Sequence, residues 1–145
     1  MKWFVCILAI ITCLAFTSCS NNTAKAVEDF NSNILEEIAR YDAVKSIAEG
    51  KEQELITGIM NADLAAFPVS EDLDLTEAHR VFSSLLIPDV VMDKTPLIQS
   101  SNFYTNLETD TVTQYITFTY YGTSLKLQIL WTDKIELVTL EVRNG

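Results

Sequence analysis

Few side chains in this sequence are of the types that carry out chemistry. The chain of 145 residues has one histidine, His79, and three cysteines, Cys6, Cys13 and Cys19. A lone histidine lacks the second His or Cys that a zinc site needs, and its place beside the helical stripe residue Phe82 indicates a boundary residue rather than a general base. The sequence contains no nucleophile elbow, P-loop or dinucleotide-binding glycine motif. We therefore predict a protein that is not an enzyme and holds no cofactor.

The densest group of acidic side chains is Glu71, Asp72, Asp74 and Glu77. Carboxylates are the ligands that Ca²⁺ prefers, but this run lacks the spacing and the glycine of an EF-hand loop. A helix that begins after Asp74 explains the run more simply, because acidic groups stabilise a helix N-terminus. We predict no metal site here.

The beginning of the chain has the layout of an export signal. Lys2 is a short cationic start, residues 3–16 are apolar apart from Thr12, and the small residues Thr17 and Ser18 precede Cys19. This order of charged, apolar and small residues is typical of a secretory signal peptide. The apolar run is shorter than the roughly 20 residues that a membrane-spanning helix needs. We predict a signal peptide over residues 1–18.

The tetrapeptide that ends in Cys19, Phe-Thr-Ser-Cys, resembles the lipobox of bacterial lipoproteins, although the family usually has Leu in the place of Phe16. The resemblance implies cleavage between Ser18 and Cys19, a diacylglycerol thioether on Cys19 and an amino terminus acylated with a fatty acid such as palmitate. The alternative is an ordinary signal peptide that leaves Cys19 as a free thiol.

The number of cysteines and the residue after Cys19 both bear on the lipobox-like motif. Cys6 and Cys13 lie in the segment to be removed, so Cys19 would have no partner, and lipidation accounts for this odd cysteine. Two or more acyl chains hold a protein on a membrane stably. The resemblance also implies outer-membrane sorting, because Ser20 is not the Asp that retains such proteins at the inner membrane. Residues 19–24 would form a short tether.

The charge of the chain excludes one class of partner. Removal of residues 1–18 takes away Lys2 and leaves 9 basic against 20 acidic residues, a net charge of −11. Binding to nucleic acid needs clustered Lys and Arg, so we predict no nucleic-acid partner. Attraction to anionic lipid is equally disfavoured, and the lipid on Cys19 would have to supply the membrane contact.

The remaining sequence predicts helices first and strands afterwards. An apolar stripe over residues 25–48 indicates a long amphipathic helix that Gly50 ends; its members are Val27, Phe30, Ile34, Ile38, Tyr41, Val44 and Ala48. We predict further helices over 51–66 and 75–87, an irregular connection over 88–101, and strands over 102–107, 111–121, 124–132 and 134–143. Short connections favour antiparallel neighbours.

The predicted fold is α+β: two to three N-terminal helices packed on a four-stranded antiparallel meander sheet, in a single domain over residues 25–145. This order of elements loosely resembles small exported domains of the cystatin-like or nuclear-transport-factor-like kind. That resemblance implies a long helix lying in the concave face of a curved sheet.

Alternation along the strands predicts which side chains form the core. In the second strand Val112, Ile116, Phe118 and Tyr120 share a face that Gln114 interrupts, and in the third Leu125, Leu127, Ile129 and Trp131 share a face. The last strand keeps its apolar residues on one side only if a bulge lies near Leu137–Val138.

The opposite, threonine-rich face of the second strand carries Tyr115 and Tyr121. Tyrosine combines a large rigid surface with a polar tip, so these two side chains are the predicted binding surface. Cross-strand aromatic packing is the simpler explanation of the tyrosines.

Taken together, these features predict a lipid-anchored protein of the bacterial envelope that binds another protein without catalysis, as an inhibitor or immunity protein does. The alternative is a module that binds or scavenges a small molecule in the concavity of the sheet.

We expect Cys19→Ala to abolish labelling of the protein by a clickable fatty acid and to leave the uncleaved precursor in cells, because the modified sulfur is lost. Labelling is measured by in-gel fluorescence. Persistent labelling of the variant would exclude Cys19 as the lipidated residue.

Overall fold

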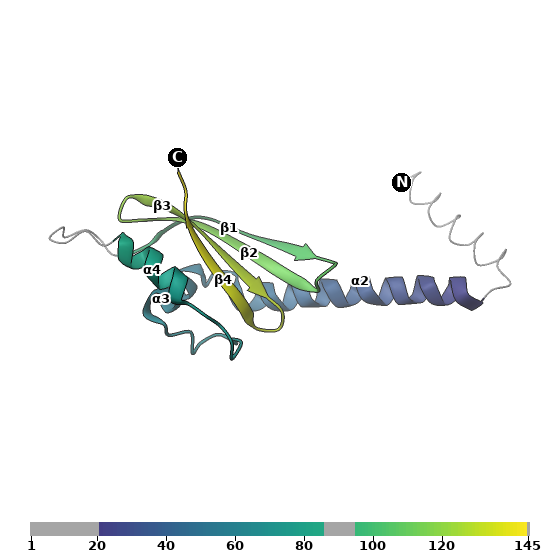
Figure 1. Cartoon of the computed structure of the whole chain (residues 1–145). Coiled ribbons are helices and arrows are strands. Elements are labelled where there is room, and N and C mark those ends of the chain that lie inside the picture. Colours follow the sequence, from purple (N-terminus) through teal and green to yellow (C-terminus); the bar gives the residue numbers. More distant parts are fainter. Residues whose placement is uncertain (1–20, 86–94, 145) are drawn as a thin grey trace, which may run out of the picture. The chain divides into compact units, whose positions relative to one another are not determined.

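The computed structural model describes residues 21–85 and 95–144 (Figure 1). The predicted signal peptide and Cys19 lie outside the described residues, as do the last two residues of the helix expected over 75–87. The described residues form helices that precede a four-stranded sheet, which confirms the predicted α+β class. The elements are α2 (Asn21–Ala48), α3 (Glu52–Asn61), α4 (Thr76–Ser84), β1 (Leu97–Asn106), β2 (Thr111–Tyr120), β3 (Thr123–Trp131) and β4 (Ile135–Val142).

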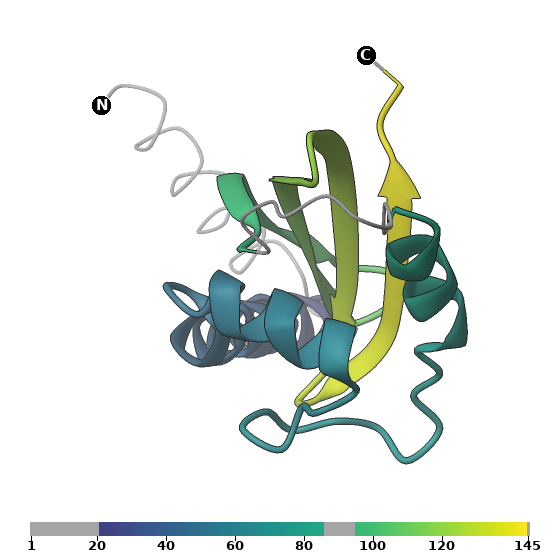
Figure 2. The same cartoon turned by 90° about the vertical axis from the view of Figure 1, so that its left-hand side faces the viewer.

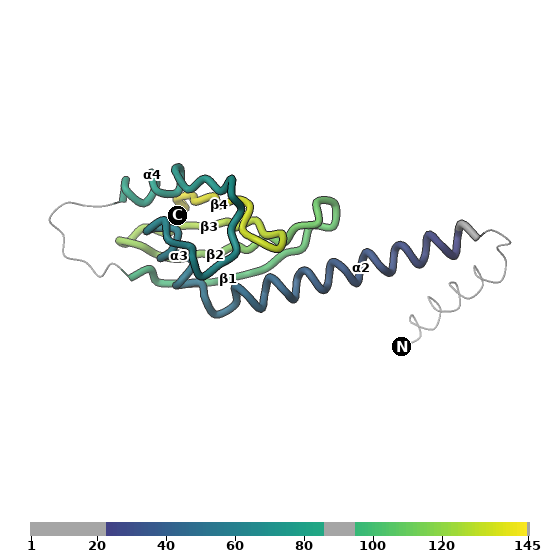
Figure 3. The backbone as a smooth tube through the Cα atoms, turned by 90° about the horizontal axis from the view of Figure 1, so that it is seen from below, coloured from purple at the N-terminus to yellow at the C-terminus, as the bar shows by residue number. Residues whose placement is uncertain are grey.

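The sheet is a meander in which each strand pairs with the next in sequence, always antiparallel (Figure 3). Its tightest connection is the turn Tyr121–Gly122, where φ is +49° and +74°. Two successive residues with positive φ match the type I′ turn, whose twist suits a hairpin. The strand expected to reach residue 121 therefore ends at Tyr120.

The first strand begins earlier than predicted. Residues 97–101 were expected in an irregular connection, but they belong to β1, where Leu97 pairs with Thr119 and Ser101 with Ile116. A register shift between Ile98 and Ser100 breaks the alternation that would have revealed the strand in the sequence. Pairing with β2 decides the conformation of this polar stretch, since strand propensity depends strongly on neighbours.

One face of the sheet is the core, as the alternation predicted. The inner-face residues of β2 and β3 are buried, and most are fully so; they are Val112, Gln114, Ile116, Phe118, Tyr120, Leu125, Leu127, Ile129 and Trp131. Helices α3 and α4 contribute Leu55, Ile59 and Phe82 to this core, and α4 lies beside β4 (Figure 2). The Phe82 ring centroid lies 5.7 Å from that of Tyr120.

Strand β4 contains the bulge that its sequence required, at a slightly different place. Pairing with β3 passes from Leu130 opposite Leu137 to Trp131 opposite Ile135, so the extra residue is Glu136 and not one of the expected pair Leu137–Val138. As a result Ile135 and Val138 are both buried, whereas Leu137 is 50% exposed.

Helix α2 starts at Asn21, so residues 21–24, expected in the tether, are helical. The chain divides into two units after Ile38. The stripe residues before this division, Val27, Phe30, Ile34 and Ile38, are exposed, and only Val44 and Ala48 are fully buried. The predicted apolar stripe is thus continuous in sequence but is buried only near the C-terminal end of the helix.

Helix α3 ends at Asn61, earlier than the predicted residue 66, because Ala62 has a left-handed conformation with φ of 52°. The chain then turns back closely over Gly58. A Cβ on Gly58 would lie 2.6 Å from the Asp63 carbonyl oxygen, so only glycine fits this turn.

We expect Trp131→Ala to lower the free energy of unfolding by about 3–5 kcal/mol, the usual cost of truncating a buried aromatic side chain. Lys126→Ala, on the opposite face of the same strand, should cost only about 0.5–1 kcal/mol, through loss of the contact between its ammonium group and the Tyr115 ring. Urea unfolding of both variants provides the measurement. Reversed costs would show that the assigned register of β3 is off by one residue.

Candidate functional site

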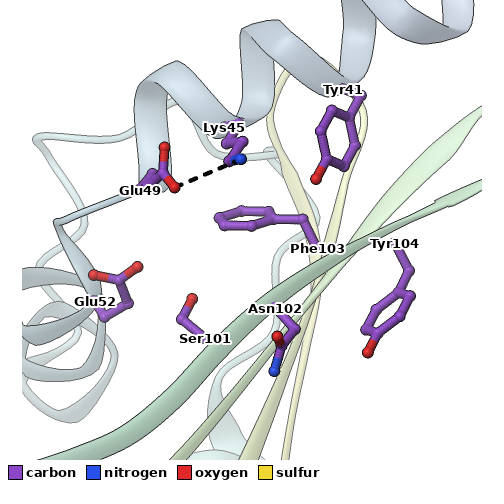
Figure 4. Close-up of a pocket in the computed structure, with 8 residues that line it drawn as sticks. All are labelled: Tyr41, Lys45, Glu49, Glu52, Ser101, Asn102, Phe103 and Tyr104. Carbon is purple, nitrogen blue, oxygen red and sulfur yellow. Dashed lines mark ion pairs between the residues drawn. The ribbon is translucent and has the colours of Figure 1, made fainter.

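One candidate site is a groove beside β1. It has a volume of about 270 Å³ and lies between the last turns of α2, the start of α3 and the strand (Figure 4). We call it the edge groove; its lining residues are Tyr41, Lys45, Glu49, Glu52, Ser101, Asn102, Phe103 and Tyr104.

The strand side of the edge groove consists of four consecutive residues, Ser101 to Tyr104. Side chains alternate between the two faces of a strand: Phe103 is turned toward α2, while Asn102 and Tyr104 lie on the other side (Figure 4). Residues of both faces can line one groove only if it follows the edge of the strand. In the described residues β1 pairs with β2 alone, so backbone N–H and C=O groups of alternate β1 residues face this open edge.

The helical side of the groove combines an aromatic end with an acidic end. The rings of Tyr41 and Phe103 meet edge to face, with centroids 6.4 Å apart. Further along α2, Lys45 Nζ lies 3.6 Å from a carboxylate oxygen of Glu49. Glu52 follows the Gly50 turn, and its carboxylate accepts a hydrogen bond from the Gly50 N–H at 3.2 Å. Two carboxylates against one ammonium leave this end of the groove with net negative charge.

The position of Ser101 in the groove is tied to the protein core. The Gln114 amide group donates a hydrogen bond to the Ser101 hydroxyl at 3.3 Å, and its carbonyl oxygen accepts one from the Trp131 indole N–H at 3.1 Å. Hydrogen bonds from Ser101 through Gln114 to Trp131 therefore connect the strand side of the edge groove to the buried core of the sheet.

The two tyrosines predicted as a binding surface do not lie together. Tyr121 is a turn residue whose ring centroid lies 4.5 Å from that of Tyr120. Burial, and secondarily the neighbouring Tyr121, raise the pKa of the Tyr120 phenol above its ordinary value. Tyr115 lies six residues away along the hairpin, about 20 Å at roughly 3.3 Å per strand residue.

Tyr115 instead shares the outer face of the sheet with a residue that the sequence did not pair with it. The ring centroids of Tyr115 and Tyr104 are 5.7 Å apart, and Lys126 Nζ lies 4.4 Å from the Tyr115 centroid. The two tyrosines also line a more open hollow of about 750 Å³ on this face. The register between β1 and β2, in which Tyr104 pairs with Thr113 and Asn102 with Tyr115, brings the two tyrosines together.

His79 and the acidic run have structural roles. His79 is half-buried, and its Nε2 lies 2.6 Å from the carbonyl oxygen of Ile59, which can only accept, so Nε2 carries the proton and links α4 to α3. The Asp74 carboxylate accepts a hydrogen bond from the Thr76 N–H at 2.9 Å. Hydrogen bonding to the Thr76 side chain, and secondarily to this N–H, lowers the pKa of Asp74. Glu77 pairs with Arg80 instead of completing a capping box. Across residues 21–85 and 95–144, no three metal-ligating side chains gather into a group that could hold an ion.

No family model, curated protein or solved structure matches this chain. Within the described part of the chain, no helix combines the length and the apolar character needed to cross a membrane.

We expect a chain that begins at residue 25 to unfold cooperatively on heating, with a midpoint that excess chelator leaves unchanged, because its stability comes from the apolar core. Circular dichroism melts with and without chelator provide the measurement. A midpoint lowered by chelator would point to a stabilising metal and would return attention to the carboxylates around Asp74.

Proposed function

We propose that the chain is a lipoprotein of the bacterial cell envelope, anchored in the outer membrane through lipid on Cys19, whose folded domain binds another protein without catalysis. The observation that carries the binding part of the proposal is the edge groove, where the open edge of β1 faces Glu49 and Glu52. Such a surface offers backbone hydrogen-bonding groups, aromatic area and charge to a partner.

The size of the groove favours a protein over a small molecule. Pockets for small ligands usually measure about 300–1,000 Å³ and are largely enclosed, whereas the edge groove is smaller, at about 270 Å³. The inner face of the sheet, where a ligand was the alternative prediction, is filled by side chains such as Phe118, Leu127 and Trp131, which have no exposed surface. Two more open hollows remain for a small ligand, one of about 570 Å³ beside α3 and one of about 750 Å³ beside Tyr104 and Tyr115. The second hollow is the second candidate, because it includes the predicted residue Tyr115.

The charge of the domain favours a basic partner. The full chain has a net charge of −10, and complementary charge speeds the encounter of two proteins and excludes partners of like charge. An inhibitor or immunity protein that covers a basic toxin or hydrolase in the envelope fits this description.

The anchor is supported by the sequence around Cys19. Acyl chains on this residue would hold the domain at the membrane, since each buried CH₂ contributes about 0.8 kcal/mol. Anchoring raises the local concentration of the domain and limits its partners to those that reach the same membrane.

The proposal is tested by photo-crosslinking in cells. A photoreactive amino acid at Asn102, in the edge groove, should give an adduct with one protein, and the same amino acid at Thr139, on the outer face away from the groove, should not. Adduct formation is measured by immunoblotting and mass spectrometry. Absence of a protein adduct at Asn102, together with specific retention of small metabolites that Tyr115→Ala abolishes, would favour the second candidate.

A further inference from the structure

We propose that the partner contributes an extended, basic segment that pairs with β1 as an additional strand of the sheet. This inference rests on the proposed protein-binding function and specifies how that binding takes place. The edge groove is the site, and a lysine or arginine of the segment would lie beside Glu49 and Glu52.

The first argument is the weak protection of the β1 edge. Exposed edge strands are normally protected by charged residues, by proline, by a β-bulge or by a covering element. Strand β1 has ten residues, Leu97–Asn106, and none of them is charged or a proline. Its register shift lies between Ile98 and Ser100, before the groove residues Ser101–Tyr104. In the described residues no backbone group pairs with its outer side.

The second argument is the contrast with β4, the other edge of the same sheet. The N–H of Ile135 donates to the Pro68 carbonyl oxygen and its carbonyl oxygen accepts from the Ser70 N–H, each at 2.9 Å. Helix α4 packs beside the strand, and β4 itself carries Glu136 and Glu141. One edge is thus charged and paired with neighbouring backbone, while the other is uncharged and is separated from α2 and α3 by the edge groove.

The third argument is the direction of the groove, which follows the edge of β1 along Ser101–Tyr104. An added strand lies about 4.8 Å from its neighbour and directs alternate side chains to opposite faces. Those on one face would meet Glu49 and Glu52 at the acidic end of the groove, and those on the other would lie beside Asn102 and Tyr104. Addition of a peptide strand to an exposed sheet edge is an established mode of recognition.

Charge favours a basic segment over a second copy of this chain as the molecule that pairs with β1. Two copies joined through β1 would bring uncharged strands together and leave Glu49 and Glu52 of each copy without a cation from the other. The net charge of −10 on each chain would oppose the contact. A basic segment neutralises the acidic end of the groove and has no such cost.

The test uses the lipidated chain that begins at Cys19, in detergent, and a capped peptide of about eight alternating valine and lysine residues, the length of an ordinary strand. We expect binding, measured by fluorescence anisotropy, and slower hydrogen–deuterium exchange of the outward-facing β1 amides. The decisive control is the same peptide with alternate backbone nitrogens methylated, because methylation removes the pairing donors and keeps every charge. Equal binding of the methylated peptide would overturn strand pairing.

Variants of the protein test the acidic end of the groove. Glu49→Gln and Glu52→Gln should each weaken binding by about 2- to 5-fold, the range expected for an exposed ion pair. Glu141→Gln, an equal change of charge on β4, should leave binding unchanged. If all three variants weakened binding equally, the attraction would come from overall charge and the proposed site would be wrong.

The outcomes also separate this inference from the proposed function. Failure of the peptide to slow exchange in β1, with a protein adduct still obtained through Asn102, would overturn strand addition and leave protein binding in place. Concentration-dependent self-association that the peptide does not displace would identify a second copy as the occupant and overturn the inference.

Discussion

The hydrogen bond between Trp131 and Gln114 is the constraint on which the rest of the sheet depends. The Trp131 side chain is fully buried, and a buried indole N–H without an acceptor costs about 1–3 kcal/mol. Gln114 supplies that acceptor from the neighbouring strand at 3.1 Å and is itself fully buried. Each of these side chains is acceptable in the core only because the other is present.

The same hydrogen-bonded chain fixes the site. Gln114 also donates to Ser101, so β1, β2 and β3 are joined through side chains as well as through their backbones. A shift of β1 by one residue would turn Ser101 to the outer face and leave the Gln114 amide without that acceptor. The register that satisfies the core therefore also sets which β1 residues line the edge groove and which lie beside Tyr115.

A feature of the fold could be predicted from the sequence where it depends on residues close together in the chain, and not where it depends on contacts between distant segments. The alternation of Leu125, Leu127, Ile129 and Trp131 is local, and the core face of β3 was predicted correctly from it. Gln114 was recognised only as an interruption, because its partners are on other strands. The groove could not be predicted, since its lining combines residues of α2, α3 and β1 that are far apart in sequence. It also depends on the turn at Gly50, where φ is +79°, which brings Glu52 toward β1.

The acidity of the chain and the bare edge of β1 are physically related. An uncharged open edge pairs readily with other edges, which promotes aggregation. A net charge of −10 keeps copies of the chain apart without placing a charge on the edge itself. Long-range repulsion between copies thus replaces the local protection that β4 obtains from α4 and from the backbone of residues 68–70. Because the charge lies outside β1, the backbone hydrogen-bonding groups of this strand stay accessible to a molecule of opposite charge. Pairing of β1 with β1 of another copy is disfavoured. A negative charge placed within β1 would protect the edge equally well against self-pairing, but the edge groove would then gain a second charged wall close to Glu49 and Glu52.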